Sequence, residues 1–430
     1  MSVPSLPPAT VPPGERIASL DFIRGVAVMG ILFANIAAFG QPMSAAFFPG
    51  AFATPAAAGD EWLWLAQLVL IDGKMRGLFT LLFGAGLMLF LERAWARGRG
   101  AGLQLRRLFW LGCFGIAHYV LLWRGDILTS YAFAGAVALL FVRWSGRRLL
   151  IFGLAAYAAG ALIATAMYGI LVFSDGADAA ADPLLAEMQG DLAVEQEQAL
   201  QQDFAHATMI ATGDYSAFVT SNIAEVPGFL GFSALLVLLE TVPLIVLGMA
   251  LHKLGFFSGS FARRKVFWWS IAGVTAGASA TLLLGLRELV GGLTYWSSLS
   301  AFAGWSMWPR LPMIIGLAGL LMLLNAKASG WTGEGIRAAG RAAFTNYAGT
   351  SLVMLWVFHG FGLGLFGGLS RLELYALALA TVPLMPVWSK AWLARYRYGP
   401  LEWLWRCLTY GRLFPLRRPA SERGGQSSKA

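Results

Sequence analysis

Long apolar stretches alternate with short polar loops along the whole chain. A helix needs about 20 apolar residues to cross a bilayer, and ten stretches reach or approach that length. Backbone amides inside lipid must be paired within the segment, so these stretches are predicted to be helices. The pattern predicts an all-α, polytopic membrane bundle of about ten helices. Their expected ranges are 22–40, 66–92, 108–124, 127–143, 149–173, 227–252, 266–286, 311–326, 342–359 and 372–393.

Two segments fit this pattern less simply. Residues 62–71 could form an interfacial helix that leaves 78–91 to cross the bilayer, which keeps the number of crossings unchanged. Residues 293–308 are rich in Trp and Ser, and we expect a helix lying at or dipping into the interface.

Composition agrees with a membrane protein, because 57% of the 430 residues are hydrophobic, 13% are charged and the mean hydropathy is +0.63. Basic residues concentrate in alternate loops, which are expected to be cytoplasmic. Residues 174–225, by contrast, carry ten acidic residues and no Lys or Arg, so this loop is expected outside. Both termini are then cytoplasmic, and the bacterial inner membrane is the expected location. The basic segments are 93–107, 143–148, 253–265, 327–341 and 395 onward.

The acidic loop divides the chain into two membrane halves. We expect five helices in residues 16–173, an external loop over 174–225 that could form a helical hairpin or cap, and a second half over 226–412. Residues 1–15 and 413–430 are predicted to be disordered tails. The net charge of +9 reflects orientation in the bilayer, so no nucleic-acid partner is expected. No metal-type Cys/His cluster is present, and no metal is predicted.

Polar residues inside the first apolar stretch are the strongest functional signal, because a charge or amide is costly in a bilayer core. Arg24 and Asn35 are eleven residues apart, which is about three helical turns and roughly 16 Å of rise. Both could therefore face one cavity. Asp21 could simply cap the helix and pair with Arg24, and Asn35 could make only an interhelical hydrogen bond.

Two further polar groups suggest chemistry. Glu240 falls inside the sixth stretch, three residues before Pro243, and must be protonated, paired or facing a cavity. His118 stands near the outer end of the third stretch, and Asp126 follows in the turn to the fourth. This carboxylate could orient the imidazole for proton transfer, although Asp126 could also be only a helix cap.

The chain resembles the YeiB-like family, domain-of-unknown-function family 418. The resemblance covers nearly the whole chain. It is carried by Ser19–Gly25 with Asn35, Gly73–Arg76, Leu82–Gly84, His118–Tyr131, Gly340–Tyr347, Gly362–Gly367, Gly399–Arg406 and Leu408–Gly411.

The Asp-x-x-Arg-Gly start with Asn35 is also similar, more distantly, to the transmembrane acyltransferase superfamily, which includes heparan-α-glucosaminide N-acetyltransferase and acyltransferase family 3. That resemblance implies transfer of an acyl group from a cytoplasmic donor such as acyl-CoA to an envelope sugar, lipid or peptide. Residues 36–61 contain no His, so the usual base of that superfamily is missing and another group must act as base.

Under this hypothesis the predicted catalytic residues are His118 as base, Asp126 as its orienting partner, Asn35 as oxyanion donor, and Glu240. The predicted donor-binding residues are Asp21, Arg24, Lys74 and Arg76.

Two other classes stay open. A proton-coupled transporter of a small solute or lipid would use Glu240 as proton carrier, with Arg24, Asn35 and Asn346 along the substrate path. A non-catalytic sensor or assembly partner would use the acidic loop. No cofactor is required in any of the three, the bilayer is the expected surrounding, and the oligomeric state is left open.

Overall fold

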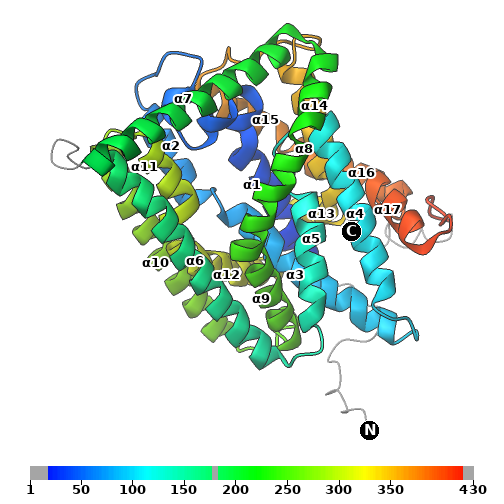
Figure 1. Ribbon diagram of the computed structural model, residues 1–430. Helices are drawn as coiled ribbons and strands as arrows, with labels where there is room; N and C mark the ends of the chain where they lie inside the picture. Colours follow the sequence, from blue (N-terminus) through cyan, green and yellow to red (C-terminus); the bar gives the residue numbers. More distant parts are fainter. Residues whose placement is uncertain (1–17, 177–182, 420–430) are drawn as a thin grey trace.

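The computed structural model describes residues 18–176 and 183–419, and its regular structure in these ranges is helical apart from one isolated β-bridge. The helices form one bundle, with α7 lying across one end and α17 projecting at the side (Figure 1). Seven helical segments within the described residues are long and apolar enough to cross a bilayer. The protein is therefore a multi-pass, all-α membrane protein, as the hydrophobic pattern predicts.

The first membrane half follows the predicted order. The second predicted stretch divides at Gly73, whose φ of +70° suits glycine, so a short helix precedes the crossing one. The helices are α1 (Ala18–Gly40), α2 (Asp60–Leu70), α3 (Lys74–Trp95), α4 (Gly102–Leu121), α5 (Leu128–Ala138) and α6 (Gly146–Gly176), with short turns η1 (Met43–Ala46), η2 (Pro49–Ala51) and η3 (Leu139–Phe141).

The acidic loop is helical, but only α7 (Pro183–Thr212) lies across the end of the bundle, because α8 (Tyr215–Leu236) belongs to the apolar segment Tyr215–Lys253 (Figure 1). α7 turns at Gly213 into α8, and the Asp214 side chain caps α8 by accepting from the Ala217 N–H. Its Ala-Asp repeats at 177–182 lie outside the described residues. α8 then runs through a π turn, η4 (Val237–Thr241), into α9 (Val242–Lys253).

The remaining helices complete the second half. Residues 293–308 form a short buried helix and a π turn that lead directly into the next crossing helix, rather than a separate span. The elements are α10 (Arg263–Val290), α11 (Tyr295–Ser300), η5 (Ala301–Trp305), α12 (Met307–Asn325), α13 (Gly330–Arg341), α14 (Ala343–Phe358), α15 (Arg371–Thr381), α16 (Leu384–Arg395) and α17 (Pro400–Tyr410).

The basic loops gather at one end of the bundle, which we call the basic end. Lys253 Nζ donates to the carbonyls of Val142 and Trp144, and Trp405 Nε1 donates to the carbonyl of Arg107. The opposite end, which we call the α7 end, is held together by contacts of α7. The Ser44 N–H donates to the Asp203 carboxylate at 2.7 Å. The Lys253 and Trp405 contacts join basic segment 253–265 to the start of 143–148, and 395 onward to 93–107, while the side of the membrane that each end faces stays a prediction.

Glycines bring the crossing helices into close contact. An added Cβ would lie 2.0 Å from the Ile245 carbonyl oxygen at Gly84, and 1.9 Å from the Leu81 carbonyl oxygen at Gly248. α3 and α9 thus meet backbone to backbone, which is how helices associate where lipid supplies no hydrophobic drive.

The tail is predicted to be disordered from residue 413, but residues 413–419 are ordered. Residues 413–419 fold back onto the end of α16, where Arg418 N donates to the Arg395 carbonyl at 3.1 Å and Tyr396 and Arg417 form the β-bridge. The rest of that tail, and the predicted tail at 1–15, lie outside the described residues.

Candidate functional site

A cavity of about 300 Å³ opens between α1, α3, α4, α5, α14 and α17 at the basic end. Four of the described residues that line this basic-end cavity are arginines, namely Arg24, Arg107, Arg341 and Arg406. Its deeper wall is aromatic and apolar, formed by Phe83, Leu111, Ile127, Tyr131, Phe344 and Tyr347. A cationic mouth above an apolar wall suits an amphipathic anion.

Aromatic rings hold two of these guanidinium groups. The Arg107 guanidinium lies 4.7 Å from the Phe90 ring centroid and 4.2 Å from that of Trp405. The Arg406 guanidinium lies over Phe414 at 4.4 Å. Stacked guanidinium groups keep their N–H edges available for phosphate or carboxylate oxygens.

Glu402 supports the cavity wall from α17. Its carboxylate accepts from the Phe344 and Thr345 N–H groups at 2.8 and 3.1 Å, and so caps the start of α14. Burial raises the pKa of Glu402. This cap fixes the register of α14, the helix that carries Tyr347 into the cavity.

His118 lies beyond the deep wall, within a buried cluster of polar side chains. Its Nε2 lies 2.8 Å from Ser351 Oγ, its Nδ1 lies 3.2 Å from Asp126 Oδ1, and its ring stacks on Tyr347 with centroids 4.9 Å apart. His118, Asp126 and Ser351 are 4%, 6% and 1% exposed, so water does not compete for these contacts. The structure thus brings together the predicted base and its predicted partner.

Local folding places Asp126 at this point. Its carboxylate caps α5 by accepting from the Leu128 and Thr129 N–H groups at 3.1 and 2.8 Å. An added Cβ at Gly115, in the middle of α4, would lie 2.4 Å from Thr129 N. The chain after α4 therefore doubles back, α5 begins level with the middle of α4, and Asp126 meets His118 inside the bundle.

Asn35 and Ser351 line a second, smaller cavity of about 10 Å³, which we call the middle cavity. Tyr347 lines both this cavity and the basic-end cavity and separates them. Within the described residues the Asn35 amide makes no hydrogen bond. The predicted pair on α1 is thus divided between neighbouring cavities, with Arg24 in the larger and Asn35 beside Ser351.

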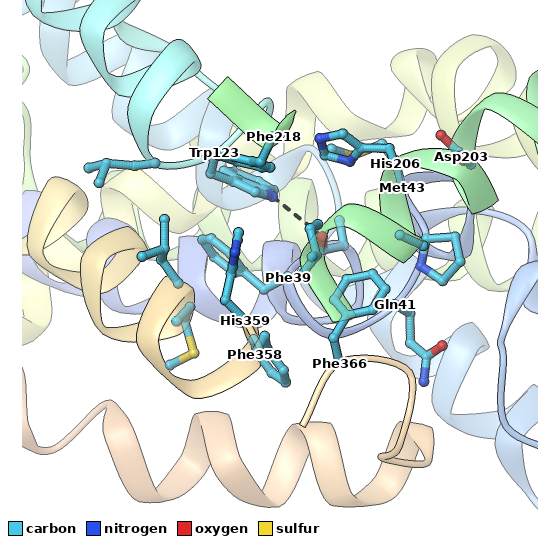
Figure 2. Close-up of a pocket in the computed structure, with 17 residues that line it drawn as sticks. Phe39, Gln41, Met43, Trp123, Asp203, His206, Phe218, Phe358, His359 and Phe366 are labelled. Atoms are coloured by element: carbon cyan, nitrogen blue, oxygen red, sulfur yellow. Dashed lines mark hydrogen bonds between the residues drawn. The ribbon is translucent and has the colours of Figure 1, made fainter. Parts of the chain in front are cut away.

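A third cavity of about 20 Å³ lies at the α7 end and shares Phe39 with the middle cavity. Figure 2 shows His206, His359 and Trp123 around it, with the Trp123 ring N–H donating to a backbone carbonyl, that of Ala38. Burial lowers the pKa of both His206 and His359 to about 4. Nearby Arg124 adds to this lowering at His206.

The three cavities follow one another along two helices. Arg24, Asn35 and Phe39 mark their order on α1, and Phe344, Ser351 and Phe358 mark the same order on α14. The three cavities therefore form an interrupted series from the basic end to the α7 end, and the side chains of Tyr347 and Phe39 separate them.

Other predicted site residues lie elsewhere. Glu240 is held between Arg310 Nη1, at 2.8 Å, and Arg76, with which it forms an ion pair, and none of the three lines a cavity described above. Lys74 Nζ donates to the Leu68 carbonyl, and Asp21 pairs with Arg24 at 3.2 Å. Of the predicted donor-binding residues, only Arg24 reaches the basic-end cavity.

Sequence reasoning missed Ser351, Arg107, Arg341 and Arg406 as site residues. Ser351 stands in an ordinary apolar helix. Arg107 appeared only in a basic segment, and Arg341 and Arg406 only in basic segments and family motifs, with no role assigned. Within the described residues no group of three or more His, Cys, Asp or Glu side chains could hold a metal ion.

Comparison with known proteins gives three results. Residues 251–412 match the family described as "Protein of unknown function (DUF418)". The chain is 30% identical over 428 residues to "Uncharacterized protein YeiB" of Escherichia coli (strain K12), covering 92% of this chain and 96% of the relative. It is 29% identical over 419 residues to "Uncharacterized protein YxaH" of Bacillus subtilis (strain 168), covering 92% and 94%. No solved structure matches it.

Proposed function

The chain belongs to the YeiB-like DUF418 family, and we propose that it is a membrane-bound acyltransferase whose acyl donor binds in the basic-end cavity. The observation that carries this proposal is the buried His118–Asp126 pair, 3.2 Å apart, behind the deep wall of an arginine-lined cavity. A base with an orienting carboxylate and an anion-binding entrance are the two parts that acyl transfer from an acyl-CoA-like thioester requires.

Each part has a role in the reaction. Arg24, Arg107, Arg341 and Arg406 bind the donor's phosphate groups, and the aromatic wall receives its acyl end. His118 accepts a proton from the attacking hydroxyl, while Asp126 stabilises the resulting imidazolium. The Asn35 amide donates to the oxyanion that forms as the carbonyl is attacked.

The expected orientation of the basic loops supports entry of the two substrates from opposite sides of the membrane. Basic loops remain in the cytoplasm, so the donor enters from the cytoplasm and the acceptor from the α7 end. This fits a bacterial inner-membrane enzyme that acylates an envelope sugar, lipid or peptide.

A transporter is the second candidate, supported by the order of the three cavities along α1 and α14. Glu240 is a poor proton carrier for it, because two guanidinium groups stabilise its carboxylate in the charged form. A transporter would therefore need another side chain to couple substrate movement to proton movement.

Donor binding is tested by thermal shift of the detergent-purified full chain, titrated with acetyl-CoA, longer acyl-CoA and CoA alone. A ligand at 100 times its Kd stabilises the folded state by about 2.7 kcal/mol. Removing one charge-assisted contact in Arg107→Ala should raise Kd about 10-fold or more.

The control is Arg264→Ala, which removes an exposed arginine from the start of α10, away from the cavity, and should leave Kd unchanged. Equal affinities in both variants, or no saturable shift with any donor, would overturn the proposal. Uptake assays in proteoliposomes would then test the transport candidate.

A further inference from the structure

We propose that Ser351 is the nucleophile of this site and that the acyl group passes through an ester on Ser351 Oγ. The inference deepens the proposed function by adding a covalent intermediate, and rests on that function for the identity of the donor. Ser351 on α14 is then the nucleophile and His118 on α4 is its base. Asp126, at the start of α5, is the carboxylate that orients the base.

The hydrogen-bond geometry selects Ser351 for this role. Its Oγ is 2.8 Å from His118 Nε2, within the range of a nucleophile poised on its base. Asp126 Oδ1 faces the other ring nitrogen at 3.2 Å, so Nε2 is the ring nitrogen that lies beside the serine hydroxyl. An acceptor hydroxyl entering first would have to displace Ser351 before reaching Nε2. Ser351 Oγ also donates to the Tyr347 carbonyl at 3.4 Å, so the hydroxyl turns from that carbonyl to His118 Nε2 before its proton is taken.

The middle cavity, about 10 Å³ in volume, marks the place that the reacting carbonyl takes once the Tyr347 ring moves aside. Ser351 and Asn35 line it together, so a carbonyl carbon beside Ser351 Oγ leaves its oxygen facing the Asn35 amide. Thr350 lines the same cavity, but its hydroxyl donates to the Asn346 carbonyl at 2.7 Å. Each of these neighbouring hydroxyls donates to a carbonyl one turn earlier in α14, and of the two it is Ser351 that also contacts an imidazole.

The two half-reactions balance. Ser351 Oγ forms a bond to the acyl carbon of a thioester donor, the carbon–sulfur bond breaks, and His118 passes the serine proton to the leaving thiolate. A hydroxyl of the acceptor then loses its proton to His118 and attacks the ester. The carbon–Oγ bond breaks, and the proton returns to Ser351.

A small dialkyl fluorophosphate tests the nucleophile without any knowledge of the natural substrates. Ser351 Oγ would displace fluoride from phosphorus, and the adduct is read by intact mass and peptide mapping of the full chain in detergent. We expect one adduct, on Ser351, abolished in Ser351→Ala and formed at least about 100-fold more slowly in His118→Ala. The control is Thr275→Ala, which removes an exposed hydroxyl of α10 outside the three cavities and should leave Ser351 labelled at the natural rate.

The inference is overturned if Ser351 stays unlabelled in both the folded natural chain and folded Thr275→Ala. It is also overturned if folded Ser351→Ala transfers acyl groups within about threefold of the natural rate, a result that leaves the proposed acyltransferase intact. Labelled Ser351 without any binding of acyl thioesters supports the nucleophile and removes only the proposed donor.

Discussion

The ion pairs of Glu240 lead to a prediction that separates a structural carboxylate from a proton carrier. The π turn η4 places Glu240 between α3 and α12, 4% exposed, with one carboxylate oxygen on Arg310 Nη1 and the other on Arg76. Glu240→Gln keeps the shape of the side chain and removes its charge. It also imitates a protonated carboxyl group.

The expected loss of stability follows from the two guanidinium charges that remain buried. Gln can still accept from one guanidinium through its carbonyl oxygen, but its NH2 group then faces the other guanidinium, and neither positive charge is neutralised. Breaking a buried pair in this way costs about 3–5 kcal/mol. With an unfolding entropy of about 2.1 cal/mol/K per residue, that cost lowers the apparent unfolding midpoint of a chain of this length by about 3–6 °C.

The assay is thermal unfolding of the detergent-purified protein, with Glu334→Gln as the matched control. Glu334 is paired with Lys390 at 2.9 Å on the surface, where its side chain is 58% exposed, so its loss should cost less than about 1 kcal/mol. A Glu240→Gln variant as stable as Glu334→Gln would refute the reasoning and restore Glu240 as a carboxyl group able to bind a proton.

Three further predictions address the two ends and the packing. Arg107→Ala should weaken acyl-CoA binding and should also reduce the dependence of that binding on salt, measured by titration at low and high ionic strength. Acidification should destabilise the fold, because the pKa values of His206 and His359 are lowered to about 4 from 6.5. The two neutral imidazoles therefore contribute fully to the free energy of folding above about pH 6.5, and this contribution is lost as the pH falls toward 4. His206→Asn should show a shallower pH dependence of its unfolding midpoint. Gly248→Ala, whose Cβ would lie 1.9 Å from a backbone oxygen of α3, should cost about 1–3 kcal/mol or more, whereas Gly349→Ala, with open space around it, should behave like the natural chain in size-exclusion and thermal assays.

Part of the candidate site follows from local sequence. His118 and Asp126 are eight residues apart across a short turn, so their meeting required only that α5 begin close to α4. Glu240 required a partner because an unpaired carboxylate is costly in a bilayer core. That expectation did not say which cations would supply it, and Arg76 and Arg310 come from 164 and 70 residues away.

Hydrophobic patterning specifies the membrane class, the approximate helix ranges and the grouping of basic loops, because each depends on local apolar length and charge. Local apolar length and charge do not predict which distant residues helix packing brings together. Ser351 reaches His118 across 233 residues, and Arg107 meets Arg406 in one cavity only because α17 packs on α4. Helix packing order depends on many small side-chain and glycine contacts spread through the bundle. The tertiary structure therefore decided which polar residues share a cavity, and so which chemistry the protein is proposed to perform.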